Sequence, residues 1–414
     1  MDRKRWPRLL ASVLSFFLVA MAASGLSTAR AQDDLKGELT LWHGWTGAEA
    51  DTLNNDVLPA WQAAHPNVKI TTLAVPFDQL KNKYQTEAAT GGGPDLLIGP
   101  ADWVGELATA ELIRPLDDLV DATALGGYIP ATVDGLRYDG KLYGLPESFE
   151  TVALFYNKTM VPEPPKTTAE MDQVAAQIAQ GKPDTYGLAL RAGFYHSAGF
   201  LFGFGAKLFD DQNKSALNSP ETVAFLNWIK NLAGKPGYWA KDDDNAMTSL
   251  FKTGKAAMVV NGPWFTADAA KAIGADNLGV APLPTISEAN DATPKPFLGL
   301  KHIMVSANAD DDQAKLAVEF AKWFTGPDSE KFLAEKAGHL PAHTGVDVSA
   351  DPIAAAFVQQ GQNATPTPTI PEMGQVWTPA GDMITKVLTG SSTPEQAAAE
   401  AQDKINKAIE SSGA

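Results

Sequence analysis

Glu38-Leu-Thr-Leu-Trp42 is the first of three short aliphatic runs that decide the fold; the others are Val68-Lys-Ile-Thr-Thr-Leu73 and Asp95-Leu-Leu-Ile98. Two stretches between them, 48–65 and 79–89, repeat their apolar residues at helical spacing. The order strand, helix, strand, helix, strand predicts a parallel sheet with helices on its faces. We therefore expect an α/β protein.

Breaks and caps mark several helices along the chain. Pro59 stands inside the first helical stretch and predicts a kink or two short helices there. A second unit of strands and helices begins near residue 150. It contains a helix opened by Ser219-Pro220 and a strand at 256–260. The last helix opens with Thr393-Pro-Glu-Gln396, which has the spacing of a capping box.

Residues 1–31 differ from the rest of the chain. Positions 3–8 are rich in Arg and Lys, an apolar run follows from Leu9 to Leu26, and Ala29-Arg-Ala31 has a small-x-small pattern. These are the three parts of a cleavable secretory signal peptide. An apolar run of this length could also serve as a membrane anchor. The cleavage site, at the expected distance after the run, favours removal of the segment.

Composition narrows the class of protein. The 414 residues are 44% hydrophobic and 20% charged, which is typical of a globular chain of two or three domains. Removing residues 1–31 takes away five basic residues and one acidic residue and leaves a net charge of −20. Such a surface repels nucleic acid and anionic lipid, so we expect neither as a partner.

The chain has no cysteine. A lipoprotein anchor attached through an N-terminal cysteine is therefore excluded, and stability has to come from a large core rather than from disulfides. A protein that diffuses freely outside the cytoplasmic membrane needs an outer barrier to keep it nearby. We expect the periplasm as its location.

No motif of catalysis or cofactor binding stands in the sequence. The G-x-S-x-G, H-E-x-x-H, Walker and G-x-G-x-x-G patterns do not occur. The six histidines do not cluster at metal-ligand spacing. We therefore expect no catalytic residue, no cofactor and no metal.

Aromatic rings and carboxylates gather instead near the ends of the expected strands, where open α/β sheets bind ligands. The residues are Trp42, Trp45, Asp102, Trp103, Glu147, Glu150, Tyr195, Trp264 and Trp377. Sugars present apolar C–H faces that stack on rings and hydroxyl groups that pair with carboxylates, so a cleft lined by both residue types suits an oligosaccharide. Taken singly, each tryptophan is also a natural core residue, and that alternative stays open.

Six short stretches carry a resemblance to a known family. They are Leu39–Trp42, Ala88–Asp95, Asp139–Pro146, Tyr156–Lys158 with Pro164–Thr167, Phe251–Met258 with Asn261–Trp264, and Ile370–Met373 with Trp377. Each is a weak signal alone. Together and in order they resemble the family-1 extracellular solute-binding proteins of ABC importers, in the maltose/maltodextrin-binding branch. The resemblance covers essentially the whole chain after residue 31.

The resemblance implies a fold and a role. The fold would be the two-lobed periplasmic-binding-protein fold of type II, with a ligand cleft between α/β lobes joined by a hinge. The N-terminal lobe would comprise 32–148 and 299–350, and the C-terminal lobe 149–298 and 351–414. The protein would be a monomer that binds an oligosaccharide and delivers it to the transmembrane permease subunits of an importer.

The resemblance also implies residues of the site. Asp102 and Glu150 match carboxylates that hydrogen-bond sugar hydroxyls in the family, and Tyr195, Trp264 and Trp377 match its aromatic platform.

The walls of the site depart from the family pattern. The segment His43-Gly-Trp-Thr46 stands where the family has an Asn, an Asp and a Lys, and Trp103 replaces an Arg. Our hypothesis is that Trp45, Thr46 and Trp103 line the cleft, where the two tryptophans add stacking surface and favour longer or cyclic glucans. Lys301 and Arg191 are the candidate cleft cations, with an ordinary surface charge as the alternative for each.

Two other functions remain open at this stage. The first is a binding protein for another solute, such as a cyclodextrin, another oligosaccharide, a polyol or a glycerophosphodiester. The second is a glycoside hydrolase that uses Glu147, Glu150 or Asp102. A hydrolase needs two carboxylates at a defined separation across the scissile bond, and the spacing of these residues does not provide it by itself.

Overall fold

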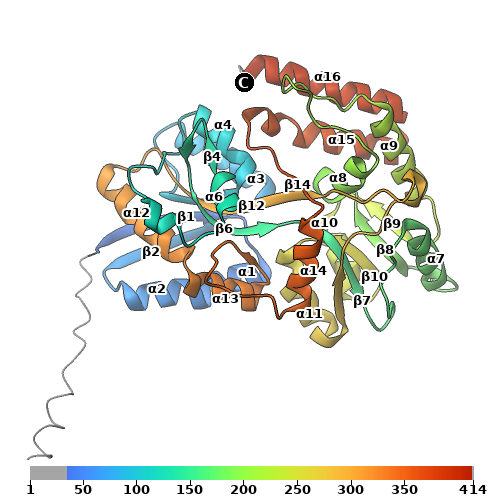
Figure 1. Cartoon of the computed structure of the whole chain (residues 1–414), viewed down its shortest axis with the longest axis horizontal. Helices are drawn as coiled ribbons and strands as arrows, with labels where there is room; N and C mark the ends of the chain where they lie inside the picture. Colours follow the sequence, from blue (N-terminus) through green and yellow to red (C-terminus); the bar gives the residue numbers. More distant parts are fainter. Residues whose placement is uncertain (1–34, 413–414) are drawn as a thin grey trace, which may run out of the picture.

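The computed structural model describes residues 35–412, which form two α/β lobes, each built around its own sheet (Figure 1). The expected two-lobed α/β fold is confirmed. The expected signal peptide, residues 1–31, lies outside the described residues. No helix within 35–412 is long and apolar enough to cross a membrane.

The sheet of the first lobe has the order β13-β6-β12-β3-β1-β2, with β14 paired to β12. Its strands are β1 (Gly37–His43), β2 (Val68–Ala74), β3 (Leu96–Pro100), β6 (Leu145–Glu150), β12 (Phe297–Val305), β13 (Leu340–Pro341) and β14 (Thr365–Pro366). β1 runs parallel to both β2 and β3, as the sequence predicts. β12 and β6 then extend this sheet in the antiparallel sense.

The helices of the first lobe follow the expected breaks. The stretch 48–65 folds as α1 (Gly47–Thr52), a π-helical segment (Leu53–Val57) and α2 (Leu58–Ala64). Pro59 explains the break, because it has no N–H for an intrahelical bond and its ring crowds the preceding turn. The other helices that matter for the site are α3 (Phe77–Ala88), α4 (Val104–Thr109), α12 (Asp311–Phe324) and α13 (Pro327–Ala337).

The sheet of the second lobe has the order β11-β7-β10-β8-β9. Its strands are β7 (Ala153–Asn157), β8 (Tyr186–Arg191), β9 (Tyr238–Lys241), β10 (Ala256–Asn261) and β11 (Leu278–Ala281). β8 runs parallel to both β9 and β10, so the carboxyl ends of these three strands share one edge.

Helices cover the second sheet and close the chain. They are α7 (Thr168–Ala179), α8 (Phe194–Gly203), α9 (Pro220–Ala233), α10 (Asp244–Lys252), α11 (Thr266–Ile273), α14 (Pro352–Gly361), α15 (Trp377–Leu388) and α16 (Pro394–Ser412). The Ser219 hydroxyl caps α9 by accepting the Thr222 N–H. α15 and α16 pack against one another and against α9, on the second lobe (Figure 1).

The chain passes between the two lobes three times. It leaves the first lobe after β6, returns along β12, and leaves again after β13 to α14, which packs against β11. β6 and β12 are hydrogen-bonded neighbours, with Gly299 opposite Glu150. Two of the three crossings therefore lie side by side in the middle of the molecule (Figure 1).

Candidate functional site

Carboxylates of the first lobe meet aromatic rings of the second lobe at the boundary between the lobes. Asp102 follows β3 in a short 3-10 turn, Ala101–Trp103, and Glu150 ends β6. The indole Nε1 of Trp377 donates a hydrogen bond of 3.0 Å to Asp102 Oδ2, so the lobes touch at this point. A Cβ on Gly299 would lie 3.0 Å from Glu150 Cγ and 3.3 Å from the Tyr195 hydroxyl. Glycine at this position therefore lets the two side chains come close.

The rings at the site form one group around Tyr195. Its ring centroid lies 6.2 Å from those of Trp264 and Trp377 and 6.0 Å from that of Phe297, which is stacked on it. Trp264 and Trp377 are more than 100 residues apart in sequence, yet they flank the same ring. The sequence analysis missed Phe297, because an aromatic residue at the start of a strand gives no signal that distinguishes the core from a site.

Lys301 belongs to the same group. Its Nζ lies 3.6 Å from Glu150 Oε1 and 4.7 Å from the centre of the Phe77 ring. Phe77 opens α3 and is 45% exposed, an unusual position for a phenylalanine, and the sequence analysis missed this residue too. The ammonium group therefore bridges a buried carboxylate and an exposed ring.

Burial dominates the electrostatics of the site. It raises the pKa of Asp102, which nearby Lys81 partly offsets, and it raises the pKa of Glu150, which Lys301 partly offsets. The pKa of Tyr195 is raised by burial and then by these two carboxylates, so its hydroxyl keeps its proton. That hydroxyl has no hydrogen-bond partner within residues 35–412. Two carboxylates, one ammonium and a neutral hydroxyl suit a neutral polyhydroxy ligand better than an anion.

Trp45, which the sequence analysis proposes for the wall of the cleft, is buried in the first lobe. Its side chain is 4% exposed, and the ring packs 6.0 Å from Phe324 and edge-on to His339 at 5.2 Å. The ring belongs to the core cluster of the first lobe. A position just after a strand does not determine whether the ring points into the core or toward the cleft, because the loop can adopt either orientation.

Trp103 is also buried, at 5% exposure. A Cβ on Gly99 would lie 2.7 Å from its ring, and Phe77 packs against it at 5.6 Å. Trp103 therefore packs beneath Phe77, and its role in the wall of the cleft stays a prediction.

Thr46 is exposed at the start of α1 and makes no capping bond. A Cβ on the next residue, Gly47, would lie 2.5 Å from Asp268 Oδ2 of the second lobe. Thr46 thus lies at the boundary between the lobes.

Glu147, which the sequence analysis names, belongs to a buried polar group whose other members sequence reasoning missed. His339 Nδ1 is 2.6 Å from Glu147 Oε1, and its Nε2 is 3.0 Å from Glu49 Oε1. These partners are 192 and 290 residues from His339, so no local pattern points to the group. Within residues 35–412, no cluster of His, Cys, Asp and Glu has the arrangement of a metal site.

Comparison with known proteins decides the family. A family model described as bacterial extracellular solute-binding protein matches residues 58–365. The chain belongs to this family. Its members and the relatives below are binding proteins rather than enzymes.

Individual relatives and solved structures cover most of the chain. The maltotriose-binding protein of Pyrococcus abyssi is 33% identical over 85% of this chain and 78% of its own length. The galactooligosaccharide-binding protein of Bacillus subtilis is 29% identical over 95% and 94%. Among solved structures, the maltose/maltodextrin-binding domain of Bdellovibrio bacteriovorus with bound maltotriose has a TM-score of 0.83 at 27% identity, covering 90% of this chain and all of that one. The GacH receptor of Streptomyces glaucescens, solved unliganded and with acarbose, has a TM-score of 0.81 at 29% identity, covering 91% and 99%.

Proposed function

We propose that this protein binds a maltodextrin-type oligosaccharide between its lobes and delivers it to the permease subunits of an ABC importer. The observation that carries the proposal is the group formed by Tyr195, Trp264 and Trp377 beside Asp102 and Glu150. Rings supply stacking faces for the C–H surfaces of glucose units, and the carboxylates accept hydrogen bonds from hydroxyl groups. The maltotriose-binding relatives support the same sugar class.

In this proposal the lobes have the bounds that the sequence predicts. The N-terminal lobe comprises 32–148 and 299–350, and the C-terminal lobe comprises 149–298 and 351–414. Strand membership supports most of this division, since β6 ends at Glu150 and β7 begins at Ala153. The exception is β14, which lies in 351–414 and pairs with the first residues of β12 in the first sheet. Export by a cleavable signal peptide, residues 1–31, places the monomeric protein in the periplasm. Sequencing the N-terminus of the exported protein tests this part, with Gln32 as the expected first residue.

Calorimetric titration of the mature protein tests the ligand. Maltotriose should bind with a dissociation constant on the order of 1 μM, about −8 kcal/mol. Galacto-oligosaccharides and cellotriose serve as comparison sugars of similar composition and different linkage. Tighter binding of a galacto-oligosaccharide would move the assignment toward the Bacillus subtilis relative. No binding of any α-glucan would contradict the proposal.

The same sugars test for catalysis. No reducing ends should be released from maltodextrins on prolonged incubation. Steady turnover that disappears in Glu150→Gln would instead make the protein a glycoside hydrolase.

A further inference from the structure

The backbone of the first lobe approaches the second lobe closely at two glycines. A Cβ on Gly47 would lie 2.5 Å from Asp268 Oδ2. A Cβ on Gly338 would lie 2.8 Å from Thr266 Cβ and 3.0 Å from the carbonyl oxygen of Pro263. Both glycines also have positive φ, so a side chain would be strained as well as crowded at either position. These two contacts form a seam between the lobes.

The second-lobe side of the seam carries Trp264 of the site. Pro263 directly precedes Trp264, and Thr266 follows it by two residues, so Gly338 touches the turn that carries the ring. The Thr266 hydroxyl is buried there and has no hydrogen-bond partner among residues 35–412. A shift of the seam would therefore move Trp264 relative to the carboxylates of the first lobe.

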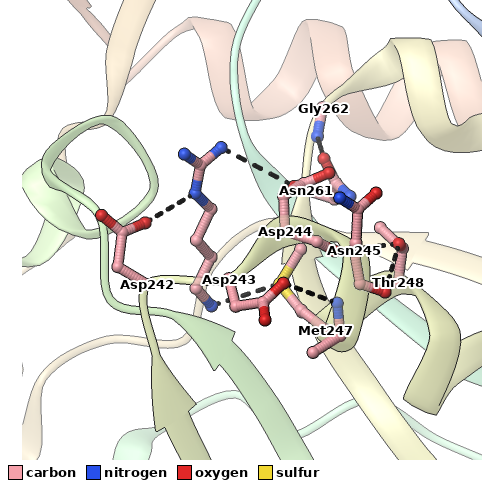
Figure 2. A network of polar contacts seen from close by, with 10 residues as sticks. Asp242, Asp243, Asp244, Asn245, Met247, Thr248, Asn261 and Gly262 are labelled. Atoms are coloured by element: carbon pink, nitrogen blue, oxygen red, sulfur yellow. Dashed lines mark hydrogen bonds and ion pairs between the residues drawn. The ribbon is translucent and has the colours of Figure 1, made fainter. Parts of the chain in front are cut away.

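Trp264 is held firmly on its own lobe. At the end of β10, Asn261 Oδ1 accepts a hydrogen bond of 2.8 Å from the Gly262 N–H (Figure 2). The Trp264 ring folds back over Gly262, where a Cβ would lie 2.1 Å from it. At the end of the neighbouring strand β8, Arg191 Nε donates to Asp242 Oδ1 at 2.9 Å (Figure 2). The position of the ring against the first lobe therefore depends on the seam.

On the first-lobe side, His339 holds the seam. It follows Gly338 directly, and its ring nitrogens lie 2.6 Å from Glu147 and 3.0 Å from Glu49. Glu49 lies two residues after the other seam glycine, so the imidazole joins the two contacts to each other. Glu147 lies in β6, and β13, which begins just after His339, pairs with β6 as well. The imidazole thus ties the seam to the strand that ends at Glu150.

This tie is charged. Burial opposes the charge of His339, but Glu147 and then Glu49 outweigh burial and raise its pKa to about 10. Both ring nitrogens therefore donate, each to a carboxylate, and such hydrogen bonds are stronger than neutral ones. Two strong bonds from one rigid ring fix its orientation and that of the backbone beside it.

We propose that His339, held by Glu147 and Glu49, is a positioning residue of the sugar site, which sets where Trp264 lies relative to Glu150. It acts through the seam and not by contact with the sugar. The inference rests on the proposed function and deepens it, because it assigns part of the affinity to residues outside the group of rings and carboxylates. A sugar bonds both lobes at once, so a placement that is fixed in advance lowers the cost of binding.

Glu49 offers the cleanest substitution, because loss of His339 would leave the fully buried Glu147 carboxylate without its partner. Glu49→Ala removes the acceptor for His339 Nε2 and should weaken maltotriose binding about fivefold in calorimetry. Glu49→Gln keeps an acceptor oxygen and should stay within about twofold of wild type. Both variants lose the charge that adds to burial in raising the pKa of Glu150. The difference between them therefore measures positioning and not electrostatics.

A double-mutant cycle identifies the ring through which Glu49 acts. In a Trp264→Ala background, the loss caused by Glu49→Ala should shrink to less than about twofold, because the ring to be positioned is gone. In a Trp377→Ala background the loss should stay about fivefold, because Trp377 is held by Asp102 instead. A merely structural weakening of the first lobe would lower affinity by the same factor in both backgrounds.

Lys336→Gln is the matched control. Lys336 lies just before the seam on α13, and it pairs with Asp56 and lies over the Phe332 ring, both in the first lobe. Its loss should leave maltotriose affinity unchanged. The melting temperature of each variant without sugar verifies that the fold is intact.

Three results would overturn the positioning role and leave the proposed function standing. They are wild-type affinity in Glu49→Ala, an equal loss in Glu49→Gln, and equal losses in the two tryptophan backgrounds. A wild-type protein that binds no maltodextrin would overturn the proposed function and the positioning role with it.

Discussion

At the residue scale, Trp264 and Trp377 should contribute much of the free energy of sugar binding. Each ring stack contributes roughly 0.5–1.5 kcal/mol beyond the burial of area. Trp264→Ala and Trp377→Ala should each weaken maltotriose binding at least tenfold, about 1.4 kcal/mol. Calorimetry measures this loss. Unchanged affinity in both variants would mean that the sugar stacks elsewhere.

Trp377 also allows its two contributions to be separated. Trp377→Phe keeps a ring but removes the hydrogen bond from Nε1 to Asp102. Its affinity for maltotriose should therefore lie between those of the wild type and Trp377→Ala. The unliganded melting temperature should change little in all three variants, because the rings line the cleft. A large fall would identify them as core packing.

Trp45 should behave in the opposite way. Because its ring is packed between Phe324 and His339, Trp45→Ala should lower the free energy of unfolding by about 3–5 kcal/mol. Urea denaturation measures the change. A variant as stable as wild type, with weaker binding of long sugars, would restore the stacking role that the sequence suggested.

His339 makes the stability of the first lobe depend on pH. Burial opposes its charge, but Glu147 and Glu49 outweigh burial and raise its pKa from 6.5 to about 10. Burial, and then Glu147, raise the pKa of Glu330 from 4.5 to about 10. Between pH 6.5 and 10 the folded protein therefore holds more protons than the unfolded chain, and the free energy of unfolding falls as pH rises.

Urea denaturation from pH 6.5 to 10 checks this dependence. Each retained proton contributes about 1.4 kcal/mol per pH unit. His339→Gln should remove roughly half of the wild-type slope, and adding Glu330→Gln should remove most of the rest. A slope that is identical in wild type and the double variant would contradict the assignment.

At the scale of single elements, the last helix offers a local test. The Gln396 N–H donates to Thr393 Oγ1 at 3.2 Å, and the Thr393 N–H donates to Gln396 Oε1 at 3.3 Å, so the predicted capping box is confirmed. Thr393→Ala should lower the free energy of unfolding by about 0.5–2 kcal/mol in urea denaturation. Thr393→Ser keeps the hydroxyl acceptor, so its free energy of unfolding should stay near that of the wild type. Equal stability of all three proteins would mean that α16 frays before the rest unfolds.

Local signals explain why the elements could be predicted while their assembly could not. The run Glu38–Trp42, the break at Pro59 and the Ser219 cap each depend on residues close in sequence, and each appears in the structure. The pairing of Gly299 with Glu150 joins distant segments, and no alternation of residues within β12 indicates its partner. The first sheet was therefore predicted in its parallel half only.

The candidate site shows the same limit at the scale of the whole molecule. Family motifs pointed to Asp102 and Trp377, which lie 275 residues apart in sequence and bond across the lobes. Phe77 lies in none of the family motifs, and only the folded structure shows that it lies beside Lys301 of the site. Trp45 is a similar case, because only the folded chain shows that its ring packs against Phe324 and His339.

The connection between the lobes determines how the whole molecule should respond to a ligand. Two of the three crossings form a single hydrogen-bonded ribbon, β6 with β12, and such a ribbon can bend more easily than either lobe can deform. A sugar held by Asp102 and Glu150 on one side and by Trp264 on the other bonds both lobes only when they are close. The ligand therefore stabilises the closed arrangement over an open one by its additional contacts.

We expect maltotriose at saturation to reduce the radius of gyration measured by X-ray scattering. The double variant Trp264→Ala/Trp377→Ala, exposed to the same sugar concentration, should keep the unliganded radius, because it lacks the contacts that favour closure. The comparison separates a response to bound sugar from an effect of the solution. If calorimetry shows the wild type saturated while its radius stays constant, the β6–β12 ribbon acts as a rigid brace, and release to a permease would have to proceed without opening of the lobes.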